Sequence, residues 1–217
     1  MWITEDKQTI PSAQDSLPGR SEAVRISGVH HVNGRSIVPP FDSECEEIVL
    51  GLGCFWGAER LFWQLPGVKV TAVGYAGGHT PNPTYEETCT GKTGHTEVVR
   101  VIFDPTVIGL PEILRASFEA HDPTQGMRQG NDIGNQYRSA IYYTREDQRA
   151  IVEKSMADYQ QALDQSGLGR ITTEVAPLRE FYYAEEYHQQ YLDYHQQYHL
   201  TLGRYHYQKL FHLLYRL

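Results

Sequence analysis

The fold is decided by residues 46–67, which read EEIVLGLGCFWGAERLFWQLPG. Residues 46–52 are largely apolar and predict a buried strand that is closed by glycines. Residues 54–65 carry apolar side chains at helical spacing, and the Pro-Gly pair that follows ends the predicted helix. The segment therefore predicts a strand that leads directly into a helix, with Cys54 at the junction.

Strand and helix patterns alternate along the rest of the chain. We predict strands over residues 68–75, 97–103, 139–144 and 171–175, and helices over 111–121 and 145–165. Two segments rich in Gly, Pro and Asn predict long surface loops, over residues 76–96 and 122–138. Loops of that length in a compact domain usually carry function. The alternation indicates an α/β or α+β fold, with its loops gathered on one side.

We expect three regions. Residues 1–45 contain scattered Pro and Gly without a sustained period, which predicts an irregular N-terminal arm. A compact domain is expected over 46–192. Residues 193–217 are rich in Tyr, His and Gln and contain one Gly and no Pro, which favours a helical tail. The tail fits three alternatives: a divergent end, a partner-binding helix, or an end scrambled by a frameshift or a sequencing artefact.

Composition excludes several classes of function. The chain has 217 residues, with 19 Lys and Arg against 27 Asp and Glu, for a formal net charge of -8. An acidic chain lacks the positive field that nucleic-acid backbones require. No apolar run approaches the roughly 20 residues that span a bilayer, and residues 1–17 lack the apolar run of a signal peptide. We therefore expect a cytoplasmic protein with neither nucleic-acid nor membrane partners.

Cys54 is the candidate nucleophile. Cys45, Cys54 and Cys89 are too few for a disulfide scaffold and indicate a reduced, intracellular protein. The N–H groups and the dipole at a helix start stabilise a thiolate, which predicts a lowered pKa for Cys54. The flanking glycines would let another molecule approach, and Phe55 and Trp56 add aromatic surface. A buried core cysteine is the alternative, which these neighbours make less favourable.

Several blocks of the sequence resemble one family. GCFWGAERLF resembles the signature of the A-type peptide methionine sulfoxide reductases. Further blocks follow in the family's order: GYAGGHTPNPTYEETCTGKTGHTEVVRVIFDP, HDPTQGMRQGNDIGNQYRSAIYY, ITTEVAP and FYYAEEYHQQYL. The likeness covers residues 47–192. It implies a two-layer α/β sandwich around a mixed sheet, and an oxidoreductase that repairs proteins by reducing methionine-S-sulfoxide, free or in proteins.

The resemblance also implies residue roles. Cys54 matches the thiolate nucleophile that becomes a sulfenic acid, and Glu97 matches the buried acid that protonates the sulfoxide oxygen. Glu97 lies on an alternating strand, in line with Val99 and Val101, although a solvent-exposed strand end is the ordinary alternative. The other matching positions would bind substrate: Phe55 and Trp56 as the wall for the methyl group, Tyr85, Tyr137 and Asp132 near the oxygen, and His188 and Tyr191 beside the pocket.

The family resemblance implies no bound cofactor, only a thiol reductant. Family members commonly carry C-terminal cysteines that resolve the sulfenic acid and pass the disulfide to thioredoxin, whereas no Cys follows Cys89 in this sequence. We expect a one-Cys cycle served by thioredoxin, glutaredoxin, glutathione or dithiothreitol, unless Cys45 or, better, a mobile Cys89 reaches Cys54. We also expect a monomer. No metal is expected, because His195 and His199 lack the further ligands of a metal site.

Two other functions remain open from the sequence. A thiol hydrolase or acyltransferase would pair Cys54 with a histidine, and His95 and His121 are the obvious candidates. The chain could instead bind sulfoxides without turnover. Hydrolysis of thioesters, or release of methionine in a single turnover only, would distinguish these from the reductase.

Overall fold

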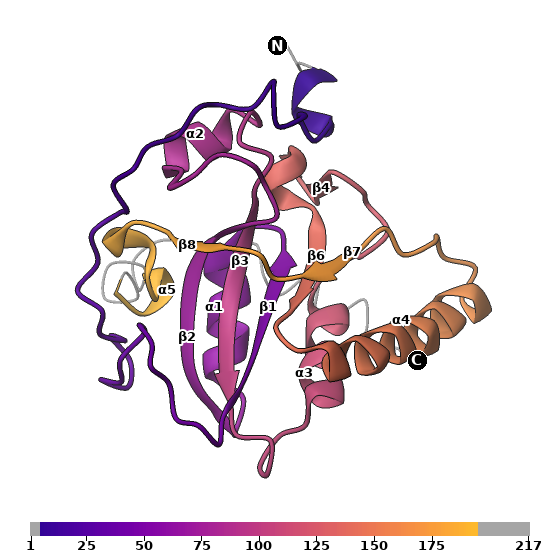
Figure 1. Ribbon diagram of the computed structural model, residues 1–217. Helices are drawn as coiled ribbons and strands as arrows, with labels where there is room; N and C mark the ends of the chain where they lie inside the picture. Colours follow the sequence, from indigo (N-terminus) through magenta and orange to yellow (C-terminus); the bar gives the residue numbers. More distant parts are fainter. Residues whose placement is uncertain (1–4, 195–217) are drawn as a thin grey trace, which may run out of the picture.

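A mixed six-stranded sheet forms the centre of the computed structural model, which describes residues 5–194 (Figure 1). The strand order is β7-β6-β1-β3-β2-β8. The strands of this sheet are β1 (Glu46–Leu52), β2 (Val68–Ala76), β3 (Thr96–Phe103), β6 (Ser139–Tyr143), β7 (Glu174–Pro177) and β8 (Phe181–Tyr183). Only β6 and β7 pair in parallel, and the other neighbours pair antiparallel.

The remaining elements are helices and one short hairpin. The α-helices are α1 (Phe55–Trp63), α2 (Tyr85–Cys89), α3 (Leu110–Ala120), α4 (Glu146–Gln165) and α5 (Tyr191–Tyr194). Short 3-10 helices are η1 (Glu5–Gln8), η2 (Asn135–Tyr137) and η3 (Glu186–His188). The hairpin pairs β4 (Arg128–Gln129) with β5 (Asp132–Ile133).

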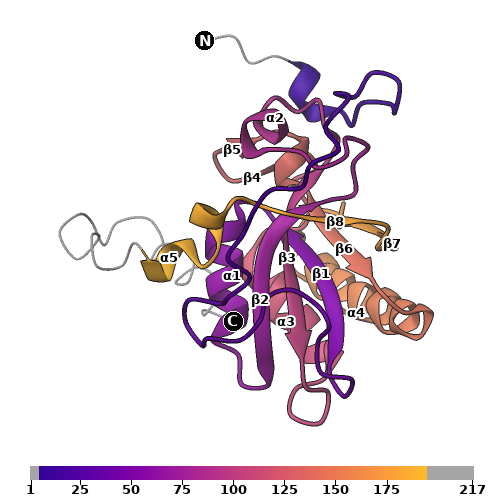
Figure 2. The ribbon, with the colours of Figure 1, turned by 60° about the vertical axis from the view of Figure 1, so that its left-hand side comes forward.

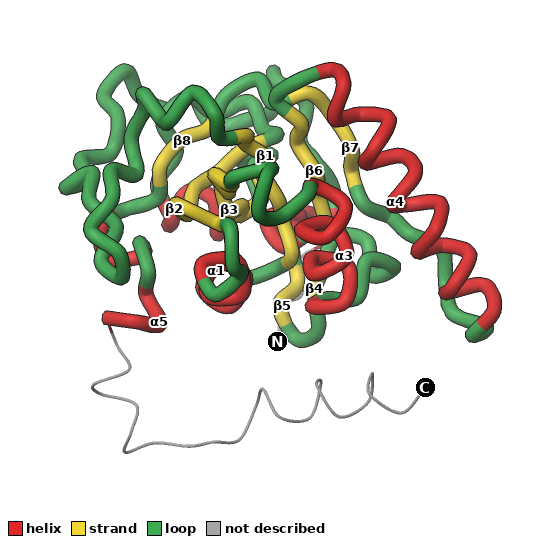
Figure 3. Tube along the Cα trace, turned by 90° about the horizontal axis from the view of Figure 1, so that it is seen from below, coloured by secondary structure: helices red, strands yellow, loops and turns green. Residues whose placement is uncertain are grey.

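The helices α1, α3 and α4 cover one face of the sheet. Phe62 of α1, Phe118 of α3 and Val152 of α4 share one core with the strand residues Ile48 and Val101. Figure 3 shows α1 and α3 on the same side of the strands. Alternate strand residues face opposite sides of a sheet, so β1, β2, β3 and β6 each contribute alternate side chains to this core. The prediction of a two-layer α/β fold around a mixed sheet is confirmed.

The other face is covered mainly by irregular chain. The arm runs around the outside of the molecule from η1 to the start of β1 (Figures 1 and 2). Ile37 of the arm is fully buried against Val70, Ala72 and Ile102 of the sheet. Within residues 5–45, η1 is the only helix, and an isolated bridge joins Val29 and Ser36. The arm thus adds Ile37 to the core, and the division into three regions stays a prediction.

Several predicted elements differ from the observed ones. The predicted loop over 76–96 contains α2, which a reciprocal capping box between Thr84 and Glu87 begins. The strand predicted over 171–175 is instead β7 (Glu174–Pro177), because its bounds are set by pairing with β6. Sequence reasoning missed β8, whose three residues pair with the end of β2.

Of the predicted helical tail, only residues 193 and 194 belong to the described part of the chain. Helix α5 is described from Tyr191 to Tyr194, and residues 195–217 lie outside the described residues. No helix between residues 5 and 194 is long and apolar enough to cross a membrane.

Candidate active site

Cys54 is the residue before the first turn of α1. The preceding Gly53 has φ +93°, and a Cβ there would lie 2.7 Å from Cβ of Gln129. Only glycine fits both the left-handed conformation and this close approach. The backbone N–H of Trp56, at the open start of α1, donates a hydrogen bond to the Cys54 sulfur. The glycine before Cys54 therefore admits another loop of the same chain.

The predicted lowering of the Cys54 pKa is wrong. Burial, and then the nearby carboxyl of Glu97, raise the pKa of the Cys54 thiol to about 12. The hydrogen bond from Trp56 lowers this pKa but is outweighed. Desolvation disfavours a charged sulfur more than the start of a nine-residue helix favours it. The free protein therefore holds Cys54 as a thiol.

Glu97 lies on β3 beside Cys54 and is buried, with 2% of its surface exposed. Its Oε2 accepts the backbone N–H of Phe55 at 3.0 Å, which ties the carboxyl to the first residue of α1. Burial raises the pKa of Glu97 to about 8, so the carboxyl carries a proton at neutral pH. The expectation of an inward-facing Glu97 is confirmed, and the alternative of a solvent-exposed strand end is wrong.

An aromatic cluster surrounds His188, which is 1% exposed. Its Nδ1 accepts the indole N–H of Trp56 at 3.0 Å, and its ring centroid lies 4.6 Å from that of Tyr85 and 5.2 Å from that of Phe55. Tyr191 stacks on Trp56 with 4.0 Å between ring centroids. Burial lowers the pKa of His188 to about 4, so the ring is neutral and carries its proton on Nε2.

Tyr85 and Tyr137 come from separate segments and meet near Glu97. Tyr85 begins α2 and Tyr137 ends η2. Burial, followed by charged neighbours that include Glu97, raises the pKa of both phenols, so both hydroxyls keep their protons. Asp132 lies exposed on β5 and raises the pKa of Cys54 and of Glu97 electrostatically. The structure thus gathers the nine predicted site residues, although Asp132 lies at the solvent-exposed side.

Sequence reasoning missed Tyr75 and Glu185. The hydroxyl of Tyr75 donates to Oε2 of Glu185 at 3.0 Å, and the backbone N–H of Tyr85 donates to Oε1 at 2.8 Å. Glu185 therefore holds the start of α2 beside the cluster. Tyr75 pairs directly with Glu97 in the sheet, so the strand pattern could have found it. No local signal singles out Glu185, because its partners lie 100 and 110 residues away.

The histidines of the hydrolase hypothesis are engaged elsewhere. His95 Nδ1 accepts the N–H of Gly78, and its Nε2 donates to the carbonyl of Thr80. His121 uses Nδ1 for the carbonyl of Ser117 and Nε2 for the hydroxyl of Ser139. With both ring nitrogens occupied, neither residue serves as a base for Cys54. Residues 5–194 contain no cluster of His, Cys, Asp and Glu that could hold a metal.

The two other cysteines, Cys45 and Cys89, are also free thiols. Cys45 precedes β1 and Cys54 follows it, and seven strand residues at about 3.3 Å each separate them by roughly 20 Å or more. Cys89 ends α2 rather than lying on a mobile loop, and its carbonyl accepts Lys7 Nζ at 2.8 Å. A disulfide needs Cα atoms within about 7 Å, so Cys45 cannot reach Cys54 without disrupting the sheet.

Known proteins resemble this chain over most of its length. The family described as peptide methionine sulfoxide reductase matches residues 46–212. Peptide methionine sulfoxide reductase MsrA of Vibrio parahaemolyticus is 60% identical over 187 residues, which cover 86% of this chain and 88% of the relative.

Two solved structures are also similar to this chain. Methionine sulfoxide reductase A of Corynebacterium diphtheriae superimposes with a TM-score of 0.82 at 45% identity, covering 91% of this chain and 95% of that one. Mxr1 of Saccharomyces cerevisiae, solved in complex with Trx2, shares the fold at 23% identity and a TM-score of 0.51, covering 71% of this chain and 90% of that one. Because the family model spans residues 46–212 and the Vibrio relative is 60% identical over most of both chains, the chain belongs to the peptide methionine sulfoxide reductase family, A type, and is an oxidoreductase that acts on sulfur.

Proposed function

We propose that Cys54 and Glu97 carry out the reduction of methionine-S-sulfoxide, both in proteins and as the free amino acid. The observation that carries the proposal is the buried carboxyl of Glu97. Its raised pKa keeps a proton on the carboxyl, next to the Cys54 thiol, whose pKa is also raised. Oε2 of Glu97 is occupied by the Phe55 N–H, which leaves Oε1 to hold that proton. A sulfoxide sulfur becomes electrophilic when its oxygen is protonated, so the acid has to act first.

The electron balance assigns each group a step. Glu97 donates its proton to the sulfoxide oxygen, and the sulfur of Cys54 attacks the sulfoxide sulfur. The proton of Cys54 passes to the Glu97 carboxylate, so the thiolate expected from the sequence exists only during attack. The S–O bond then breaks as the oxygen moves to Cys54. The sulfoxide is reduced to methionine, and Cys54 is oxidised to a sulfenic acid.

The surrounding side chains position the substrate. Phe55 and Trp56 form the apolar wall for the methyl group, supported by His188 and Tyr191. The Tyr85 hydroxyl, which hydrogen-bonds the Cys89 sulfur in the free protein, and the Tyr137 hydroxyl keep their protons, and we assign both as donors to the sulfoxide oxygen. Since Asp132 is exposed, we assign it an electrostatic role at the entrance.

An external thiol completes the cycle. Cys45 lies at the opposite end of β1, and Cys89 ends α2 with its backbone carbonyl bonded to Lys7, so we assign reduction of the Cys54 sulfenic acid to a thiol from outside the chain. A thioredoxin-like protein, glutaredoxin, glutathione or dithiothreitol would take this role, and the complex of Mxr1 with Trx2 favours a thioredoxin. No bound cofactor is needed, and we propose a monomer that acts in the cytoplasm.

The test is an anaerobic single turnover with dabsylated methionine-S-sulfoxide, followed by mass spectrometry of each cysteine. One equivalent of methionine should form, with Cys54 trapped by dimedone and Cys45 and Cys89 reduced. Cys89→Ser is the matched control and should give the same yield. A yield of one equivalent that no added thiol raises would favour a binding protein without turnover. Thioester hydrolysis without sulfoxide reduction would overturn the proposal.

A further inference from the structure

A second buried carboxyl belongs to Glu59 of helix α1. It faces the chain segment that carries His188 and Tyr191 of the aromatic cluster. Glu59 is fully buried. Its Oε2 accepts the backbone N–H of Gln190 at 2.7 Å, and its Oε1 accepts the Gln190 amide at 2.6 Å and the Thr71 hydroxyl at 3.0 Å. No cation within residues 5–194 forms an ion pair with it. A buried carboxyl without a cation is stable only where several donors satisfy it.

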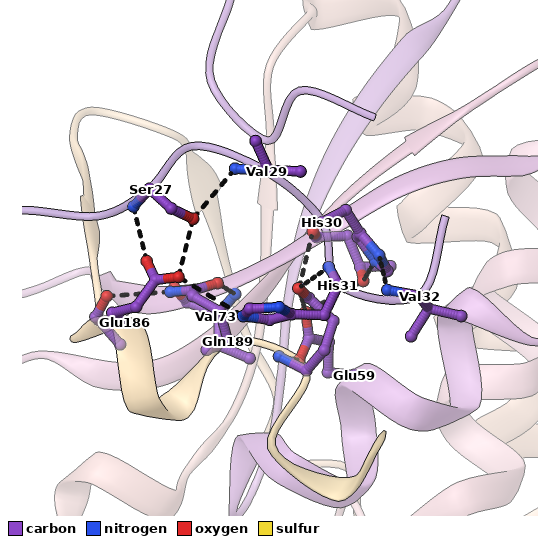
Figure 4. A network of polar contacts seen from close by, with 12 residues as sticks. Ser27, Val29, His30, His31, Val32, Glu59, Val73, Glu186 and Gln189 are labelled. Atoms are coloured by element: carbon purple, nitrogen blue, oxygen red, sulfur yellow. Dashed lines mark hydrogen bonds and ion pairs between the residues drawn. The ribbon is translucent and has the colours of Figure 1, made fainter. Parts of the chain in front are cut away.

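The donors around Glu59 have a fixed direction. His30 Nδ1 accepts the N–H of Val32 at 3.2 Å, which assigns the ring proton to Nε2. His30 Nε2 therefore donates to the Thr71 hydroxyl, at 3.0 Å, and Thr71 donates to Glu59. Figure 4 shows this chain from His30 towards Glu59. Every hydrogen bond points towards the carboxyl, an arrangement that favours its ionised form.

These bonds hold an unusual turn. Gln190 has φ +48°, a left-handed conformation that residues other than glycine rarely adopt. Its side-chain oxygen also accepts the N–H of His31 at 3.0 Å. Gln190 lies between His188, which accepts the Trp56 indole N–H, and Tyr191, which stacks on the same ring. The direction of this turn therefore determines whether both side chains can meet Trp56.

The arm holds the same segment from outside. The N–H and the hydroxyl of Ser27 donate to the two oxygens of Glu186, each at 2.7 Å (Figure 4). The Gln189 amide donates to the carbonyl of Val73, and its oxygen accepts the N–H of Val73. Residues 186–190 are thus fixed by the arm, by β2 and by α1 together.

We propose that Glu59 is a positioning residue: by holding the Gln190 turn, it places His188 and Tyr191 against Trp56 and so sets the affinity for the sulfoxide substrate. Glu59 is not a catalytic residue, because its hydrogen bonds go to Thr71 and Gln190 and not to Cys54 or Glu97. The inference rests on the proposed function in taking Trp56 as the wall of the substrate site.

The decisive variant is Glu59→Gln. The amide keeps the size of the side chain but turns one acceptor into a donor, which then faces a donor of Gln190 or Thr71. In single turnovers, which do not depend on recycling, we expect the apparent substrate Kd to rise about tenfold while the rate constant at saturation stays within about threefold. Glu153→Gln, on the exposed face of α4, is the matched control and should change neither.

A second pair of variants separates the turn from the general stability of the fold. Gln190→Gly adopts φ +48° freely and keeps the backbone N–H to Glu59, whereas Gln190→Ala loses the same side chain and is strained. We expect the apparent Kd to rise more for alanine than for glycine. Equal Kd values for Gln190→Ala and the unmodified chain would overturn the proposal even if Glu59→Gln fails to fold.

The readouts distinguish this inference from the proposed function. Binding of methionine sulfoxide to Cys54→Ser variants, measured by tryptophan fluorescence, reports affinity even without turnover. A lower saturated rate with unchanged Kd in Glu59→Gln would overturn the positioning role. Absence of sulfoxide reduction by the unmodified chain would contradict the proposed function instead, while the binding series would still test Glu59.

Discussion

Two buried carboxyls, that of Glu97 on β3 and that of Glu59 on helix α1, are used in opposite ways. Glu97 accepts one backbone N–H, and its pKa is raised to about 8. Glu59 is buried as deeply but accepts three hydrogen bonds, and its pKa is raised only to about 7. Burial raises the pKa of both carboxyls; the donors of Gln190 and Thr71 lower that of Glu59, whereas the charge of Asp132 raises that of Glu97 further. Glu97 is thereby suited to donate a proton, and Glu59 to fix the Gln190 turn by hydrogen bonds.

Replacing the nucleophile should have the largest effect, because the comparison assumes that Glu97 serves Cys54. We expect Cys54→Ser to abolish methionine formation, since Cys54 is the one of the three cysteines that directly precedes a helix beside Glu97. Chromatography of the dabsylated product after a single turnover measures this. If Cys54→Ser forms methionine at the normal rate, Cys54 is not the nucleophile, and the role of Glu97 as its proton donor partner is wrong as well.

Glu97→Gln tests the first member of the pair. A general acid contributes about 10²–10⁴-fold, so the saturated single-turnover rate should fall by that factor while the apparent Kd stays nearly constant. Glu59→Gln should show the reverse pattern. If both variants change the same kinetic constant, the two carboxyls do not have separate roles.

The pH profile tests the protonation of Glu97. Its pKa is raised to about 8, so the carboxyl keeps its proton below that pH and loses it above. Because the proton is needed for the first step, the single-turnover rate should fall about tenfold per pH unit above roughly pH 8. Stopped-flow measurements from pH 6 to 10 follow this limb, and Glu97→Gln should lack it. A rate that rises through this range would indicate attack by a preformed Cys54 thiolate.

Stability should separate the two residues in the opposite order. Glu59→Gln leaves buried donors without an acceptor, which costs about 1–3 kcal/mol and lowers Tm by roughly 2–10 °C for a chain of this size. Glu97→Gln should cost less than about 1 kcal/mol, because its amide oxygen still accepts the Phe55 N–H. Thermal unfolding at pH 7 compares the two variants, with Glu153→Gln as the exposed control. A more stable Glu59→Gln would mean that the ionised carboxyl is a burden to the fold.

The smallest effect is expected at Cys89, which interacts electrostatically with Cys54 and Glu97 and forms the last residue of α2. Cys89→Ser should change turnover with dithiothreitol by less than about twofold, because an external thiol reduces Cys54. A high yield of a Cys54–Cys89 disulfide after one turnover would show that α2 opens and that this chain resolves its own sulfenic acid.

Local patterns in the sequence were sufficient for the strand and helix around Cys54. The alternation of residues 97–103 also placed Glu97 on the inward face, together with Val99 and Val101. Period and punctuation are properties of neighbouring residues, so they can be read without knowledge of the fold. The family blocks likewise identified the nine residues that the structure gathers, although their individual roles stay proposals.

Tertiary structure alone decided how those residues are protonated. A helix start predicted a thiolate at Cys54, but burial and Glu97 keep its proton in place. It also decided that Tyr75, Glu59 and Glu185 support the site. Glu59 and its partner Gln190 are 131 residues apart in sequence, and their hydrogen bond exists only because α1, β2 and the last described turn pack together. Desolvation and long-range hydrogen bonds depend on what surrounds a side chain in space, and no local pattern in the sequence records that.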